Sequence, residues 1–89
     1  MLYVAMLPIV DQELNAKVRP DHLKYLDDLH KQDKVVLAGP FTDKKGGMVI
    51  YKANSYEEAK ELAEKDPAVV EKARTLELRE WSPLSFPLE

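Results

Sequence analysis

The chain carries two hydrophobic periodicities, which together predict four strands and two helices. Short apolar runs rich in strand-forming residues, each bounded by proline, glycine or polar residues, predict the strands. Turn signals in the segment FTDKKGG indicate that the second and third strands form a hairpin. Pro8 is expected to close the first strand, and Gly39 and Pro40 the second. The predicted strands are residues 2–7, 34–38, 48–52 and 75–81.

The stretch RPDHLKYLDDLH, residues 19–30, has the spacing of an amphipathic helix. Proline suits the first turn of a helix, where its missing N–H costs nothing, so we expect this helix to begin at Pro20. Residues 9–18 are then expected to be a polar connection, and the helix is expected to end near Gln32 or Asp33. On a helical wheel one face carries His22, Leu26 and Leu29, and Leu23 and Tyr25 lie at its borders.

A second helix is predicted to begin after Ser55, which has the character of an N-cap residue. Glu58, three residues further on, is expected to complete a capping box. Pro67 either ends this helix or starts a new turn, so we expect residues 67–73 to add a short turn.

The predicted order of elements is βαββαβ. Short connections and right-handed crossovers fold this order into a four-stranded antiparallel sheet with both helices on one face, the α+β arrangement called ferredoxin-like. The first three strands are apolar on both sides, which an antiparallel sheet with one wet face does not need. We therefore predict that a second copy covers the other face as a homodimer, with Leu84, Phe86 and Leu88 as clasps.

Composition narrows the classes of protein that remain. With 89 residues there is room for one small domain, predicted at residues 1–82, followed by an apolar tail at residues 83–89. A net charge of −3 and scattered basic residues argue against nucleic-acid binding. The absence of cysteine excludes disulfides and thiolate metal sites. The apolar N-terminal run is too short to span a membrane and lacks basic residues, so we expect a soluble, cytoplasmic protein.

Two polar residues occupy positions on predicted apolar helix faces. His22 lies on the apolar face of the first helix, and Asp66 projects onto the same stripe as Ala59 and Ala63 in the second. Because both helices lie on one sheet face, these two side chains are expected to converge. A carboxylate bonded to an imidazole fixes its tautomer and holds the ring ready to accept a proton, which is the arrangement of a general base.

Structural explanations of the same residues remain open. A histidine on an apolar face is often a hydrogen-bonded interior residue, and an aspartate before Pro67 is a good N-cap for a new turn. Capping leaves one carboxylate oxygen free, so the two roles of Asp66 are compatible. His30 suits a helix end. Gly39 and Pro40 are either strand punctuation or a point where a ligand approaches the backbone closely.

The blocks RPDHLKYL, VVLAGPF, GGMVIYKANSYEEAKELAEKDPAVV and LELREW, which follow one another between Leu2 and Trp81, resemble the YciI family. The resemblance implies a ferredoxin-like fold that dimerises through its sheets as a dimeric α/β barrel. It places a proposed active-site dyad on His22 and Asp66, and pocket residues on Gly39 and Pro40. One described relative is a chlorohydroxyhydroquinone dehydrochlorinase. This chain departs from the family where an aromatic residue often follows Asp-Pro, because Ala68 stands there.

Together, the residues and the resemblance predict a small acid/base enzyme that needs neither metal nor organic cofactor. Asp66 would orient His22, and His22 would move a proton on a small, cyclic, oxygenated substrate in an elimination, including loss of HCl, or an isomerisation. Tyr25, Gly39 and Pro40 are expected to contact that substrate. The alternative is a non-enzymatic dimer that binds a small ligand or a partner protein, with the His22–Asp66 pair as a structural hydrogen bond. No nucleic-acid or membrane partner is expected.

Overall fold

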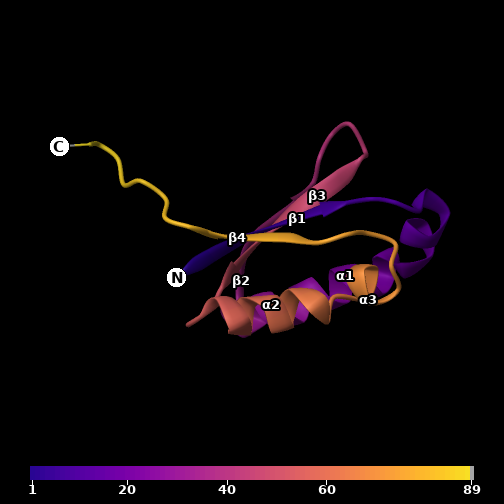
Figure 1. The fold of residues 1–89 in the computed structure, drawn as a ribbon, viewed down its shortest axis with the longest axis horizontal. Helices are drawn as coiled ribbons and strands as arrows, with labels where there is room; N and C mark the ends of the chain where they lie inside the picture. Colours follow the sequence, from indigo (N-terminus) through magenta and orange to yellow (C-terminus); the bar gives the residue numbers. More distant parts are fainter. Residues whose placement is uncertain (89) are drawn as a thin grey trace.

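The computed structural model describes residues 1–88, which form one antiparallel sheet and three helices. The strands lie in the order β2-β3-β1-β4. All three helices lie on one side of the sheet (Figure 1), which confirms the predicted ferredoxin-like α+β class. In chain order the elements are β1 (Leu2–Pro8), α1 (Gln12–Lys31), β2 (Val35–Pro40), β3 (Gly46–Lys52), α2 (Tyr56–Glu64), α3 (Pro67–Val70) and β4 (Glu77–Trp81).

Helix α1 is two turns longer than the sequence predicted, and the expected polar connection was wrong. Asp11 is the N-cap, and its side chain accepts a hydrogen bond from the Leu14 N–H at 3.0 Å. Pro20 therefore lies inside the helix instead of at its first turn. The cap and a buried stripe that continues through Asn15 and Val18 offset the one backbone hydrogen bond that proline removes.

The second and third strands are also longer than predicted. Gly39 and Pro40 belong to β2 instead of ending it, and the connection to β3 is residues 41–45. Gly46 and Gly47 are the first two residues of β3, and no glycine has a positive φ. A turn conformation therefore does not explain why glycine stands at these positions. Close approach does, because a Cβ on Gly46 would lie 2.8 Å from the carbonyl oxygen of Leu7.

A β-bulge interrupts the pairing of β2 with β3. Val35 lies opposite Tyr51, whereas Leu37, two residues later, lies opposite Ile50, so the register shifts between them. Val36 is the extra residue on the bulged strand. Because Tyr51 and Ile50 point to opposite faces, the bulge lets Val35 face the helices and Leu37 face away.

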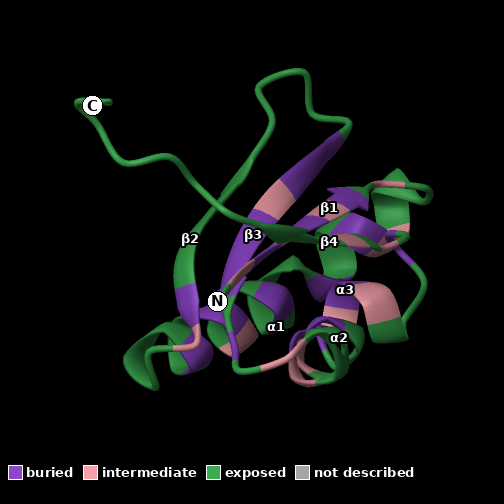
Figure 2. Cartoon of the chain, turned by 60° about the vertical axis from the view of Figure 1, so that its left-hand side comes forward, coloured by how far each residue is buried: buried purple, intermediate pink, exposed green. Residues whose placement is uncertain are grey.

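The core lies between the sheet and the helices. Alternate residues of β1, namely Tyr3, Ala5 and Leu7, are at most 1% exposed. They pack in one cluster with residues of β2, β3, α1 and α2. In Figure 2, β1 and β3 are largely buried, whereas most of β2, β4 and the tail are exposed. The principal core cluster comprises Tyr3, Ala5, Leu7, Leu26, Leu29, Val35, Val49, Tyr51, Ala53, Ala59 and Ala63.

The other face of the sheet carries no helix; it is largely apolar over β1, β2 and β3, whereas β4 places Glu77 and Arg79 there. Val4 lies opposite both Ile50 and Arg79, and Leu37 lies opposite Ile50, so these side chains form one row across that face. We call this the outer face; it also carries Leu2, Met6, Met48 and Trp81. Leu37 is 66% exposed and Trp81 44% exposed. The tail leaves the body beyond β4 (Figure 1), and its Leu84, Phe86 and Leu88 are exposed. The last residue of the predicted tail, Glu89, lies outside the described residues.

Candidate functional site

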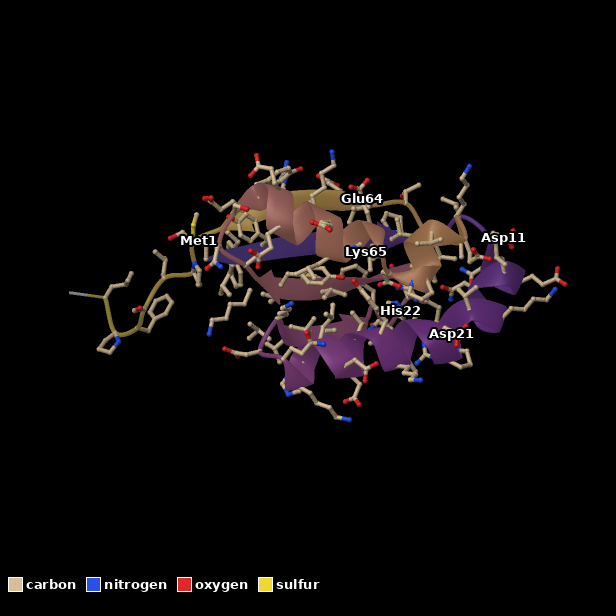
Figure 3. The ribbon with its side chains drawn as sticks, turned by 90° about the horizontal axis from the view of Figure 1, so that it is seen from below. Met1, Asp11, Asp21, His22, Glu64 and Lys65 are labelled. Carbon is tan, nitrogen blue, oxygen red and sulfur yellow. The ribbon has the colours of Figure 1, made fainter. Side chains whose placement is uncertain are left out.

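The two polar residues expected to converge do so. His22 of α1 and Asp66 are joined by a buried hydrogen bond, with Nδ1 of the imidazole 2.7 Å from Oδ1 and 2.8 Å from Oδ2. His22 is 5% exposed and Asp66 0%. Figure 3 shows His22 between α1 and the segment formed by α2 and α3. An ionised carboxylate can only accept, so Nδ1 carries the proton and Nε2 is left with its lone pair.

Asp66 is also the N-cap of α3, so its structural role and its bond to His22 coexist. Its Oδ1 accepts from the Ala68 N–H at 2.9 Å, and Pro67 occupies the first position of the helix. The cap fixes the carboxylate rotamer, because the accepting oxygen cannot leave the backbone N–H without losing that bond. A fixed carboxylate in turn fixes the plane of the imidazole. The short turn predicted after Pro67 is confirmed.

A cavity of about 130 Å³ lies against His22. Asp66 does not line it, so the cavity meets the dyad at His22 and not at the carboxylate. A wider, more open pocket of about 430 Å³ adjoins it and shares Arg19, Pro40 and Arg74 with it. The residues that line the smaller cavity are Arg19, His22, Leu23, Leu26, Ala38, Gly39, Pro40, Met48, Val49 and Arg74.

Four of the five predicted site residues lie in the dyad or line the cavity, and Tyr25 does neither. His22 and Asp66 are hydrogen-bonded, and Gly39 and Pro40 line the cavity. Tyr25 is not among the lining residues; its hydroxyl donates to the Leu62 carbonyl oxygen at 2.6 Å. That carbonyl is in the last turn of α2, where intrahelical partners run out, so Tyr25 caps the helix that leads to Asp66.

The two tyrosines near Asp66 are held neutral. Burial, followed by the charges of Asp66 and Glu61, raises the pKa of Tyr25 to about 12. Burial, then Asp66, then Tyr25 raise the pKa of Tyr51. The Tyr51 hydroxyl is buried and has no hydrogen-bond partner among residues 1–88.

Arg74 was missed by the sequence analysis. It lies between α3 and β4, is 5% exposed, and its Nε donates to Oδ1 of Asn15 at 2.8 Å. Burial lowers the pKa of its guanidinium; the charge of Asp66 opposes this effect and that of Arg19 adds to it. The available signal was Asn15, which lies seven residues before His22 on the same helical stripe and became visible only once α1 was extended to Asp11.

Two other classes of site have no support in the described part of the chain. Residues 1–88 hold no group of three or more histidine, cysteine, aspartate or glutamate side chains placed to bind a metal ion. Nor is any helix among these residues long and apolar enough to cross a membrane. His30, the other histidine, contacts the Val35 carbonyl oxygen through Nδ1 at 2.8 Å, at the end of α1.

Comparison with known proteins places this geometry in context. The family described as the YCII-related domain matches residues 1–82. The uncharacterized protein YjpA of Bacillus subtilis (strain 168) is 33% identical over 76 residues, which are 85% of this chain and 89% of that protein. A solved structure of 5-chloro-2-hydroxyhydroquinone dehydrochlorinase (TftG) from Burkholderia phenoliruptrix AC1100, in complex with 2,5-dihydroxybenzoquinone, has a similar fold. The TM-score is 0.78 and the identity 22%, with 92% of this chain and 94% of that chain covered.

Proposed function

The chain belongs to the YCII-related domain family, and on that premise we propose that it is a small acid/base enzyme in which His22 is the general base. The observation that carries the proposal is the bond between Asp66 and Nδ1 of a histidine whose ring lines a cavity. Asp66 holds the ring in the tautomer that presents the Nε2 lone pair, and stabilises the imidazolium that forms when Nε2 takes a proton.

The reaction classes that fit this arrangement are elimination and isomerisation on a small, cyclic, oxygenated substrate. In an elimination, Nε2 removes a proton from an sp³ ring carbon, as in the keto tautomer of a hydroxylated ring. The C–H electrons form a C=C bond, and the leaving group departs from the adjacent sp³ carbon with its bonding pair. For a chlorinated ring the products are the unsaturated ring, chloride and an imidazolium whose proton passes to solvent. The fold shared with a dehydrochlorinase supports this choice of reaction. General-base catalysis of this kind contributes about 10²–10⁴-fold.

The cavity supports a one-ring substrate. Its volume of about 130 Å³ is close to the roughly 150 Å³ of an engineered protein cavity that accommodates benzene. Gly39 and Pro40, at the end of β2, line this cavity on the side opposite α1.

The test is proton transfer to carbon-bound positions, followed by NMR in deuterated water. Hydroxylated quinones and chlorinated hydroxyhydroquinones are the probes, and chloride release is measured on the chlorinated ones. We expect exchange or elimination by the wild type, and a loss of about 10²–10⁴-fold in His22→Gln. The matched control is His30→Gln, which removes a histidine outside the cavity and should leave the rate unchanged.

The rival is a non-enzymatic small-ligand-binding protein in which the His22–Asp66 pair only stabilises the fold. Under that reading no probe reacts faster with the wild type than in buffer, while His22→Gln lowers the melting temperature. That pair of results would exclude the proposed catalysis. Equal rates in wild type and His22→Gln would exclude His22 as the base.

We further propose that two copies pair through their outer faces as a homodimer. The supporting observations are the apolar side chains Val4, Leu37 and Ile50 side by side on a face without helices, and the exposure of Leu37 and Trp81. The exposed apolar side chains of the tail would add contacts to the partner copy. Sedimentation should give a dimer for the wild type and a monomer for Leu37→Glu, because a buried carboxylate opposes association. The control is Val70→Glu, which puts the same charge at an exposed apolar position on α3, away from the outer face, and should leave the dimer intact. A monomeric wild type would refute the proposal.

A further inference from the structure

Arg74 is a buried cation without an anionic partner. Among residues 1–88 no carboxylate lies within ion-pairing distance of its guanidinium, and its one side-chain hydrogen bond is from Nε to the neutral Asn15. A guanidinium carries five N–H groups, so the donors on its two Nη atoms remain. Those atoms are not sealed in the core, because the Tyr51 hydroxyl is the one buried side-chain polar atom in this part of the chain that has no partner.

Nη1 of Arg74 lies close to Gly47, opposite Pro40, and Pro40 lines the cavity beside His22. Arg74 lines both that cavity and the wider pocket next to it, so it lies where the two join. Arg19 lines both as well, and Lys44 lines the wider pocket. No acidic residue lines either one. In a chain of net charge −3, this joined space is therefore a local basic region, which attracts anions.

The guanidinium is held in place before any ligand arrives. Asn15 fixes Nε from one side at 2.8 Å. On another side Gly47 leaves the space that Nη1 needs, because a Cβ there would lie 3.1 Å from Nη1 and 2.9 Å from the Gly39 carbonyl oxygen. A donor that is already ordered binds its partner at a lower entropic cost. This also explains Gly47, which turn geometry does not.

We propose that Arg74, assisted by Arg19, is the anion subsite of this cavity, and that its ligand is a one-ring organic anion. The negative oxygen, carried on an sp² carbon as in an enolate, phenolate or carboxylate, is bound by the Nη donors of Arg74. The ring then lies against His22. The anion subsite itself needs no turnover; only the placement of the ring against the base rests on the proposed function.

The chemical consequence follows from the charge that proton removal creates. When a base takes a proton from a carbon conjugated to this oxygen, electron density moves onto the oxygen. A guanidinium already placed there stabilises that charge with no reorganisation. Arg74 and His22 would thus act on opposite ends of one conjugated system, which is why a neutral hydrocarbon ring would be a poor ligand.

The experiment is calorimetric titration with two rings of similar size. The anionic probe is 2,5-dihydroxybenzoquinone, which is ionised at neutral pH, and the neutral probe is hydroquinone. A hydrogen bond to a charged group contributes about 1.5–3 kcal/mol, equivalent to roughly 10- to 150-fold in affinity. We expect the wild type to bind the anionic probe at least about tenfold more tightly than hydroquinone, and Arg74→Met to lose that preference while hydroquinone binding changes little.

Two further variants keep the test decisive. Lys60→Met, on an exposed lysine of α2 that lines neither pocket, is the charge-matched control and should retain the preference. Arg19→Met changes an exposed side chain and should reduce the preference by a smaller factor even where Arg74→Met does not fold. A wild type with no preference for the anion, or an Arg74→Met that weakens both probes equally, would overturn the proposal. His22→Gln separates the two proposals, because it should abolish catalysis and leave the anion preference intact.

Discussion

The two halves of helix α1 use one buried stripe for different purposes. In the C-terminal half, Leu26 and Leu29 are 7% and 6% exposed and belong to the principal core cluster. Towards the N-terminus, up to His22 at the helix midpoint, the same stripe carries Asn15 and His22, and each is bound to a polar partner from the chain around α3. The stripe is continuous, so helical spacing does not distinguish its two halves.

The difference lies in what each half meets. Leu29 meets apolar side chains of the sheet, and the chain closes that space by itself. His22 and Asn15 meet Asp66 and Arg74, and beside them a cavity remains. Buried polar groups lower stability unless they are hydrogen-bonded. We therefore expect the C-terminal half to dominate the free energy of unfolding and the N-terminal half to dominate ligand binding.

The largest expected effect on stability is at the apolar half. Leu29→Ala removes a side chain that is 6% exposed and should lower the free energy of unfolding by about 2–5 kcal/mol, because a cavity replaces packed atoms. Urea denaturation at a fixed protein concentration measures this loss. Binding of 2,5-dihydroxybenzoquinone, measured below the onset of unfolding, should change little. If Leu29→Ala weakened binding as much as Arg74→Met does, the assignment of stability and of ligand binding to different parts of α1 would be wrong.

Val70→Ala serves as the control for that measurement. Val70 is 55% exposed, and truncating it leaves no cavity, so the free energy of unfolding should stay within about 0.5 kcal/mol of the wild type.

A smaller effect is expected at the boundary between the halves, where Tyr25 caps α2. Tyr25→Phe removes the hydrogen bond to the Leu62 carbonyl and should cost about 0.5–1.5 kcal/mol at pH 7. The cost should depend on pH. The unfolded tyrosine ionises near a pKa of 10.0, whereas the folded one keeps its proton up to a pKa of about 12.

The direction of that pH dependence follows from proton binding. Between these two pKa values the unfolded chain binds fewer protons at Tyr25 than the folded chain, so the stability that Tyr25 contributes is complete below pH 10 and falls as the pH rises toward 12. Urea denaturation of wild type and Tyr25→Phe between pH 8 and about 11 should therefore show the difference shrinking. A constant difference would mean that the Tyr25 hydroxyl is not held neutral by its surroundings.

Much of the fold was predictable because it depends on short-range patterns. Strand order followed from the βαββαβ sequence of elements, and the Ser55 cap is present, with its side chain accepting from the Glu58 N–H. The convergence of His22 and Asp66 was also predictable, because two helices on one face of a sheet bring their apolar stripes together. These inferences needed only periodicity, caps and topology.

What was missed depends on contacts distant in sequence. Pro20 was predicted in the first turn of α1 because proline strongly prefers that position. The Asp11 cap and the buried stripe outweigh this preference, and the helix begins earlier. Arg74 gives no local signal, since its partner Asn15 is 59 residues away. Gly47 resembled a turn residue, and its actual neighbours come from β2 and from Arg74. Periodicity identifies interior positions but not the groups that meet there.

The bulge at Val36 bears on how this molecule avoids uncontrolled association. β2 is an edge strand, and an edge offers unpaired backbone groups to which another chain can add as a further strand. The register shift between Val35 and Leu37 breaks the regular spacing of those groups and increases the local twist. An incoming strand would lose its alignment at this point. The bulge therefore discourages open-ended growth along the β2 edge of the sheet.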